Sequence, residues 1–196
     1  MLHWLYEWHI ARNLKILPEH ICFMIAERDM EAVPEKIREV AVWCRELGMS
    51  GIIFHISTPE PPVPGKCLEK IRAIGDVVRL TLLYDDTREV MGSGIDITVA
   101  IGLSGREEIT RCIRAMARDN VDPETIDEHL IEAYLTFHYE PDLVIKTGGD
   151  HLTDFLIWQS VYSEIFFSDV NWKYFRKVDF LRALRDYQFR KRRFGK

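Results

Sequence analysis

The stretch DLVIKTGGDHLTDFLIWQSVYSEIFF, residues 142–167, passes from an apolar run through a Gly-Gly pair into a second, longer apolar run. A short continuous apolar run that ends at a glycine turn is typical of a strand buried on both faces of a parallel sheet. We therefore expect a strand over 142–147 and a helix over 153–165, with Thr153 or Asp154 as its cap. That helix would hold one carboxylate, Glu164, among aromatic and aliphatic side chains, where a charged group usually has a partner or a function.

The rest of the chain repeats this alternation of apolar runs and helical patterns. We expect further strands over 20–26, 51–57, 77–84 and 95–103, and helices over 34–48, 66–75, 105–119, 122–135 and 177–195. The polar residues 85–94 are expected to form only a connection. This pattern predicts an α/β fold, a single domain with a mainly parallel sheet covered by helices on both faces. Ligands of such sheets bind at the carboxyl ends of the strands, so the residues that follow each strand are the first candidates for a site.

Length and charge set limits on the function. The chain has 196 residues, 47% of them hydrophobic, which suits one domain over residues 1–196. Its net charge of −5 argues against a nucleic-acid partner. The end of the chain, about residues 186–196, is nevertheless basic. Such a tail favours an anionic partner, a phosphate group or a peripheral contact with a membrane surface, and a merely solubilising tail is the alternative.

The cysteines and the start of the chain indicate where the protein works. None of the four cysteines, Cys22, Cys44, Cys67 and Cys112, forms a CxxC pair, so we expect buried free thiols and a cytoplasmic, reducing environment. The opening residues lack the features of a signal peptide, and no apolar run is long enough for a membrane span. One apolar helix face is expected near the start, to pack on the body or on a partner; it comprises Leu2, Trp4, Leu5 and Trp8.

Five segments in order carry a family resemblance. They are WCRELGMSGIIFHIST (43–58), ITVAIGLSGREEITRCIR (97–114), DLVIKTGGD (142–150), FLIWQSVYSEIFFSDVNW (155–172) and FRKVDFLRALRDYQFRKRRFG (175–195). Together they resemble the cis-prenyltransferases, the undecaprenyl and dehydrodolichyl diphosphate synthase family. The resemblance implies a dimeric enzyme that condenses isopentenyl diphosphate onto an allylic diphosphate to make a Z-polyprenyl chain, with Mg²⁺ as the usual cofactor.

The first motif of that family is lost. After the first strand the family has Met-Asp-Gly-Asn-Arg-Arg-Trp, whose Asp binds the catalytic metal and whose glycine and arginines hold diphosphate. Here Ala26 stands in place of the Asp, and Glu-Arg-Asp-Met (27–30) replaces the phosphate-binding residues. A methyl group cannot bind Mg²⁺, and carboxylates repel a diphosphate. A shifted motif with Asp29 as the ligand is the alternative, but the loop still lacks its glycine and arginine pair.

The other motifs survive in part. Ser57, Thr58, Gly105 and Arg106 remain, whereas Pro59 and Glu60 displace the Glu-Asn of the second motif. By resemblance, a remnant of the substrate and metal site comprises Lys146 in place of Arg, Gly148, Gly149, Thr153 in place of Ser, and Glu164 at a metal-site Glu. A second arginine, which binds the homoallylic diphosphate in the family, is absent. We expect no catalytic residue in this chain and only Glu164 as a metal ligand.

The end of the chain keeps the family's Arg-x-Gly as Arg193, Phe194 and Gly195. In the family this segment crosses the dimer interface and binds diphosphate in the partner's active site. The ending resembles that of the Nogo-B-receptor-like, non-catalytic subunits. The resemblance therefore implies a non-catalytic subunit in a heterodimer or heterotetramer with a catalytic cis-prenyltransferase chain, which would bind most of the Mg²⁺. Isopentenyl and allylic diphosphates would bind at the shared site, and the apolar segment 158–167 would form the dimer surface.

Two alternatives remain open. One is a self-sufficient homodimeric synthase with a rebuilt first motif. The other is a lipid-binding or scaffolding relative that transfers no prenyl group.

Overall fold

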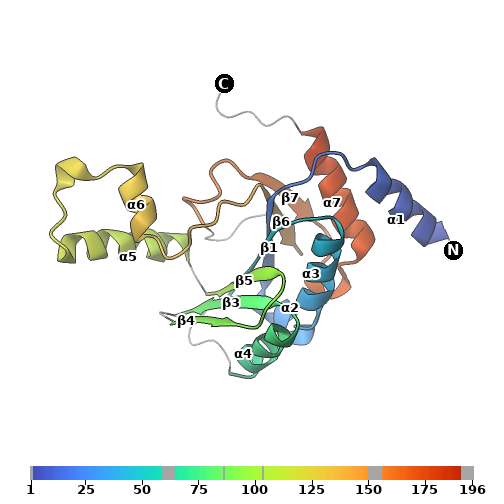
Figure 1. The fold of residues 1–196 in the computed structure, drawn as a ribbon, viewed down its shortest axis with the longest axis horizontal. Helices are drawn as coiled ribbons and strands as arrows, with labels where there is room; N and C mark the ends of the chain where they lie inside the picture. The colour runs from blue at the N-terminus through green and yellow to red at the C-terminus, as the bar shows by residue number, and fades with distance from the viewer. Residues whose placement is uncertain (1, 59–64, 86, 103, 150–155, 191–196) are drawn as a thin grey trace.

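The computed structural model describes residues 2–58, 65–85, 87–102, 104–149 and 156–190. Its centre is a seven-stranded sheet in the order β4-β3-β5-β2-β1-β6-β7 (Figure 1). The strands are β1 (His20–Ala26), β2 (Gly51–Ser57), β3 (Arg79–Tyr84), β4 (Thr87–Met91), β5 (Asp96–Ile101), β6 (Leu143–Thr147) and β7 (Glu164–Ser168). Neighbouring strands run parallel except β3 and β4, which are antiparallel. The mainly parallel α/β fold is therefore confirmed.

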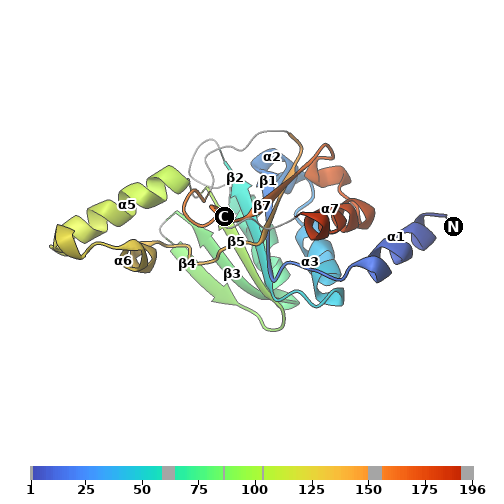
Figure 2. The same cartoon turned by 90° about the horizontal axis from the view of Figure 1, so that it is seen from above.

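Seven α-helices surround the sheet in the described part of the chain. They are α1 (Leu2–Asn13), α2 (Glu27–Ala32), α3 (Lys36–Glu46), α4 (Gly65–Arg72), α5 (Gly105–Arg118), α6 (Glu128–Tyr134) and α7 (Lys177–Phe189). Alternate residues of the strands, such as Phe23 and Phe54, pack with α2, α3, α4 and α7 in one large apolar core. The second face has a smaller core, covered by Phe137 and Leu156 from connecting segments. Helices α5 and α6 project from one side of the sheet, and α1 lies at the opposite end of the molecule (Figures 1 and 2).

The stretch after β6 is not the expected helix. Residues 157–162 form turns, and residues from Glu164 onward form β7, which pairs in parallel with β6. A short apolar run of aromatic and β-branched residues fits a strand as well as a helix, and the open edge of β6 selects the strand. The expected caps Thr153 and Asp154 lie outside the described residues.

Three smaller expectations also need correction. The polar connection 85–94 contains β4, an exposed edge strand whose charged residues hid it in the sequence. The helical segment expected over 122–135 is split, because Asp122 caps a short 3₁₀ turn and Asp127 caps α6. The last helix ends at Phe189, before Arg190, and residues 191–195 of the expected helix lie outside the described ranges.

Two expectations about location can be compared with the described residues. Cys22, Cys44 and Cys112 are buried free thiols, as expected. No helix in the described ranges is long and apolar enough to cross a membrane. Of the expected apolar face of α1, Leu5 and Trp8 are exposed, whereas Ile10 of the same helix is buried; the side chains of Leu2 and Trp4 are not described.

Candidate functional site

The carboxyl ends of β1, β2 and β6 lie side by side. They bring the segment after Ala26 close to Lys146 and the Gly-Gly pair. Ala26 of β1 pairs with Ser57 of β2, and Met24 pairs with Lys146 of β6. The Thr147 hydroxyl donates to the Met24 carbonyl at 3.1 Å, which fixes the end of β6 against β1. The carboxyl ends of these strands, where the sequence predicts the site, are therefore held next to one another by the pairing of the strands.

The Gly-Gly pair makes the turn that leaves β6. Gly148 and Gly149 have φ angles of 65° and 137°, in the region where side chains are disfavoured. The Gly148 amide donates to the carbonyls of Ser168 and Val170, and a Cβ on Gly148 would lie 3.0 Å from the Cβ of Asn171. The pair thus ties the end of β6 to the segment that follows β7.

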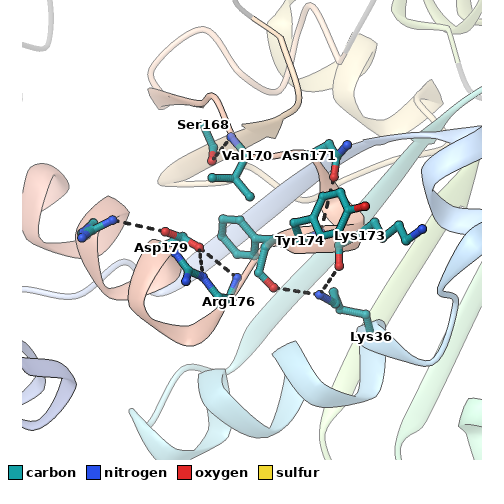
Figure 3. A network of polar contacts seen from close by, with 10 residues as sticks. Lys36, Ser168, Val170, Asn171, Lys173, Tyr174, Arg176 and Asp179 are labelled. Carbon is teal, nitrogen blue, oxygen red and sulfur yellow. Dashed lines mark hydrogen bonds and ion pairs between the residues drawn. The ribbon is translucent and has the colours of Figure 1, made fainter. Parts of the chain in front are cut away.

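That segment, residues 168–179, is held by a network of polar contacts (Figure 3). The Lys36 ammonium at the start of α3 donates to the carbonyls of Lys173 and Phe175, both at 2.8 Å. Asp179 is buried and accepts the backbone N–H of Arg176 at 3.1 Å, which caps α7. Residues 168–179, which lie beside the Gly-Gly turn, are therefore attached to α3 and α7 of the large core.

The first motif has become a short acidic helix. Helix α2 begins directly after Ala26, whose side chain makes no capping hydrogen bond, and it has Glu27 and Asp29 in its first turn. Carboxylates at a helix N-terminus stabilise the helix through its dipole. The same carboxylates occupy the place where an approaching diphosphate would need positive charge. Met30 of α2 is buried and anchors this helix to the large core.

Lys146 is a cation at this edge. Its side chain is buried and donates to the Thr147 carbonyl at 3.3 Å. Burial lowers the pKa of Lys146, Asp29 opposes this change, and Arg28 adds to it. Asp29 also lies beside the Gly-Gly turn, where one of its carboxylate oxygens is 3.8 Å from the place of a Gly148 Cβ. Asp29, the alternative metal ligand considered for the first motif, thus lies near Lys146.

Glu164 is not brought to this edge. It pairs with Leu143 at the amino end of β6, whereas Ser168 pairs with Thr147 at the carboxyl end. The two ends of β7 are about 13 Å apart at the usual rise of a strand. Glu164 instead forms an ion pair with Arg190 at 3.2 Å, immediately after α7. Arg190, the last described residue, therefore lies beside Glu164.

The described residues at this edge do not form a magnesium site. Mg²⁺ prefers several oxygen ligands, and β1 ends here in a methyl group. Within the described ranges, no cluster of three or more His, Cys, Asp or Glu residues is able to hold a metal. The expected site residues Thr153, Arg193, Phe194 and Gly195, and the displaced second-motif residues Pro59 and Glu60, lie outside those ranges.

A second polar group went unnoticed in the sequence. Glu108 on α5 is buried, and it accepts the Phe137 amide at 2.8 Å and the Gln159 side-chain amide at 3.1 Å. Gln159 and Trp158 line a cavity of about 290 Å³ between α6 and the 135–140 segment. A glutamate on a helix with exposed polar neighbours gives no signal of burial in the sequence. Glu108 holds the projecting α5 to the segment before β6.

Comparisons with known proteins identify the family to which this fold belongs. A family model described as "Putative undecaprenyl diphosphate synthase" matches residues 70–195. The chain is 35% identical to a tritrans,polycis-undecaprenyl-diphosphate synthase (geranylgeranyl-diphosphate specific) of Methanocaldococcus jannaschii, over 83% of this chain and 72% of the relative. It is 33% identical to an isoprenyl transferase of Deinococcus radiodurans, over 100% of this chain and 92% of the relative. The structure of a probable undecaprenyl diphosphate synthase from Campylobacter jejuni superposes with a TM-score of 0.68 at 20% identity, covering 93% of this chain and 100% of that one.

The chain belongs to the undecaprenyl diphosphate synthase family, the cis-prenyltransferases. The match to the family model starts at residue 70, so the altered segment from β1 to α2 falls outside it.

Proposed function

We propose that this chain is a non-catalytic subunit of a heteromeric cis-prenyltransferase that makes a long-chain Z-polyprenyl diphosphate. The observation that carries the proposal is the end of β1, where Ala26 is followed by a helix with Glu27 and Asp29 in its first turn. Prenyl transfer from an allylic diphosphate develops negative charge on the leaving group. That charge needs a metal or cationic donors in the transition state. At the end of β1 this chain offers a methyl group followed by Glu27 and Asp29, and the nearby Lys146 is buried, with its ammonium donating to the Thr147 carbonyl.

The chemistry would then be done by a partner chain of the same family that keeps the Asp and the diphosphate-binding residues. That partner would bind the Mg²⁺, and both diphosphate substrates would bind at the shared site. This chain would supply Arg193, Phe194 and Gly195 to that site. The Glu164–Arg190 ion pair supports this role, because it fixes the base of the tail beside the first residue of β7.

The docking surface for the partner would be the free edge of the sheet at β7. Several exposed apolar side chains gather on β7 and the turns before it: Ile157, Val161, Tyr162 and Phe167. A free strand edge with an apolar patch usually marks a protein–protein interface. A homodimer in isolation is compatible with the proposal, since the same surface can pair with itself when the partner is absent.

Two other functions are alternatives, and the comparisons favour the first of them. The relatives that match over most of their length are named as synthases or transferases, which favours a self-sufficient homodimeric enzyme with a rebuilt first motif. A lipid-binding or scaffolding relative is the third possibility, and it would need no diphosphate chemistry.

The three functions are separated by one assay. The chain alone, a family member with an intact first motif alone, and both co-purified are incubated with labelled isopentenyl diphosphate, an allylic diphosphate and Mg²⁺. We expect no incorporation of label by this chain alone and more incorporation by the pair than by the intact homologue alone. Turnover by the lone chain would establish the homodimeric enzyme. A co-purified pair with no gain in turnover would favour the scaffolding relative.

A further inference from the structure

Helix α1 is apolar on two opposite sides. Ile10, 2% exposed, packs into the large core near α7, and Leu14 and Leu17 continue this contact after the helix ends at Asn13. Trp8 is two residues earlier, about 200° away around a helix of 3.6 residues per turn. Trp8 and Leu5 lie on that outward side and are 49% and 50% exposed. A surface helix normally has one apolar face, so the second face requires its own explanation.

The outward face is displayed by a helix that is fixed in place. The Arg182 guanidinium of α7 lies 5.7 Å from the ring centre of Tyr6. Gln188 of α7 accepts the Lys15 amide at 3.0 Å and donates to the Asn13 carbonyl at 3.4 Å. Helix α1 is nevertheless the outermost element at its end of the molecule (Figures 1 and 2). The exposed Leu5 and Trp8 are therefore held outward and are not simply part of a frayed end.

Positive charge surrounds this face, although the whole chain has a net charge of −5. The Arg12 guanidinium lies over the Trp8 ring, 5.1 Å from its centre, and Lys15 follows in an exposed position. Arg182 and Arg185 are exposed on the neighbouring side of α7. The acids of α1 and α7 are fewer: Glu7, Asp179, which pairs with Arg182 at 3.3 Å, and Asp186, which pairs with Arg190 at 2.6 Å. The local sign of charge is therefore opposite to that of the molecule.

We propose that the outward face of α1, with Leu5 and Trp8 at its centre and Arg12, Lys15, Arg182 and Arg185 around it, docks on an anionic lipid surface. Tryptophan and leucine enter the boundary between headgroups and acyl chains. Arginine and lysine extend their apolar stems along the same boundary and place their charges at the anionic headgroups. The charge complementarity favours a lipid surface over a second copy of this acidic chain. This inference does not depend on whether the chain catalyses.

The test measures binding of the full chain to vesicles by flotation. Vesicles of phosphatidylcholine with phosphatidylglycerol are compared with vesicles of phosphatidylcholine alone. We expect binding to the anionic vesicles, weaker binding to the neutral ones, and loss of binding as salt is raised. Leu5→Ser/Trp8→Ser should weaken binding to the anionic vesicles by about tenfold or more. Arg182→Gln/Arg185→Gln should weaken it by roughly fivefold or more.

Matched variants control for exposure and charge. Ile113→Ser/Tyr174→Ser removes exposed apolar side chains elsewhere, and Arg114→Gln/Arg118→Gln removes exposed cations on α5, at the opposite end of the molecule (Figure 1). Both controls should bind as the unchanged protein does, and thermal unfolding checks that every variant folds. The proposal is overturned if the unchanged chain binds neither kind of vesicle, or if the α1 variants bind as well as the controls. It is also overturned if Leu5→Ser/Trp8→Ser leaves vesicle binding intact while it disrupts an oligomer seen by light scattering, since the face would then meet protein.

Discussion

Ala26 ends β1 beside Ser57, and the first turn of α2 that follows it holds the acids Glu27 and Asp29 with Arg28 between them. The backbone after β1 is coiled into a helix that its own carboxylates stabilise. We therefore expect that restoring one carboxylate at position 26 is not enough to restore a diphosphate site.

We predict that Ala26→Asp leaves the lone chain without measurable prenyl transfer. The new carboxylate would face Glu27 and Asp29 without the arginines and glycine that hold a diphosphate. The measurement is incorporation of labelled isopentenyl diphosphate with Mg²⁺, with an intact homologue as the positive control. Turnover created by this single change would show that the site is nearly complete and would contradict the non-catalytic assignment.

Gly148 offers a residue-scale test of the turn. We expect Gly148→Ala to destabilise the protein by about 1–3 kcal/mol, because the φ angle is positive and the new Cβ would press on Asn171. Gly65→Ala is the matched control: nothing lies within 4 Å of its Cβ, so its effect should be small or stabilising. The measurement is the free energy of unfolding in urea. Equal effects of the two changes would contradict the assigned role of the turn.

Among the single residues of the site, sequence reasoning located those that follow from strand register. Gly148, Gly149 and Lys146 lie at the predicted carboxyl edge because the apolar run before them is a strand. Glu164 is assigned to the metal site by resemblance alone, and in the structure it lies at the amino end of β7, away from that edge. The closeness of Asp29 to Gly148 depends on how α2 packs and leaves no mark in the sequence.

At the scale of elements, the β3–β4 hairpin is pinned to α4 by one cluster. Arg72 of α4 donates two hydrogen bonds to Glu89 of β4, at 2.6 and 2.8 Å, and Tyr84 of β3 donates a third at 2.6 Å. The hydrogen bonds from Arg72, followed by the one from Tyr84, lower the pKa of Glu89 from 4.5 to about 2. The cluster gives the charged strand β4 a reason to pair despite its weak strand pattern.

The stability of this hairpin should depend on pH. Because the folded-state pKa of Glu89 is depressed, its contribution is fully present above pH 4.5 and is lost as the pH falls toward 2. We predict that Glu89→Gln lowers the melting temperature at neutral pH and that the difference from the unchanged protein shrinks below pH 4.5. Thermal unfolding across this range is the measurement. A difference that stays constant with pH would show that the carboxylate charge contributes nothing.

The edge strand β7 carries the other element-scale prediction. Val161 is 65% exposed in the turns before β7, and Ile157 is exposed nearby. We predict that Ile157→Glu/Val161→Glu weakens subunit association at least about tenfold, which corresponds to ~1.4 kcal/mol. Ile113→Glu on α5 is the control. Light scattering over a concentration series checks the result. Unchanged association would show that the interface does not lie at β7.

Elements with long apolar runs were predictable, whereas β4 and β7 were not. Strands β1, β2, β5 and β6 are buried on both faces, so their apolar runs are continuous and unambiguous. Strand β7 is short and lies at one edge of the sheet, and β4 lies at the other edge and contains the adjacent charged residues Arg88 and Glu89. For both strands, pairing with a neighbouring strand, β6 or β3, decides the structure.

At the scale of the whole molecule, the two proposed contact surfaces lie on different elements. The free edge at β7 and the base of the tail beside Glu164 lie on the side of the sheet's last strand. The outward face of α1 is a different surface with opposite charge to the chain as a whole. A subunit of this kind can hold a catalytic partner with one surface while the other is available for lipid.

The most direct test of the non-catalytic role is steady-state turnover of the co-purified heteromer with a changed tail. We predict that Arg193→Ala lowers turnover about tenfold or more, because two charged hydrogen bonds to a diphosphate in the partner's site would be lost. Arg192→Ala, one residue earlier in the same basic tail, should leave turnover nearly unchanged. Gel filtration should show intact complexes in both cases. Unchanged turnover of a fully assembled Arg193→Ala complex would mean that the tail does not serve the partner's site, and it would contradict the account.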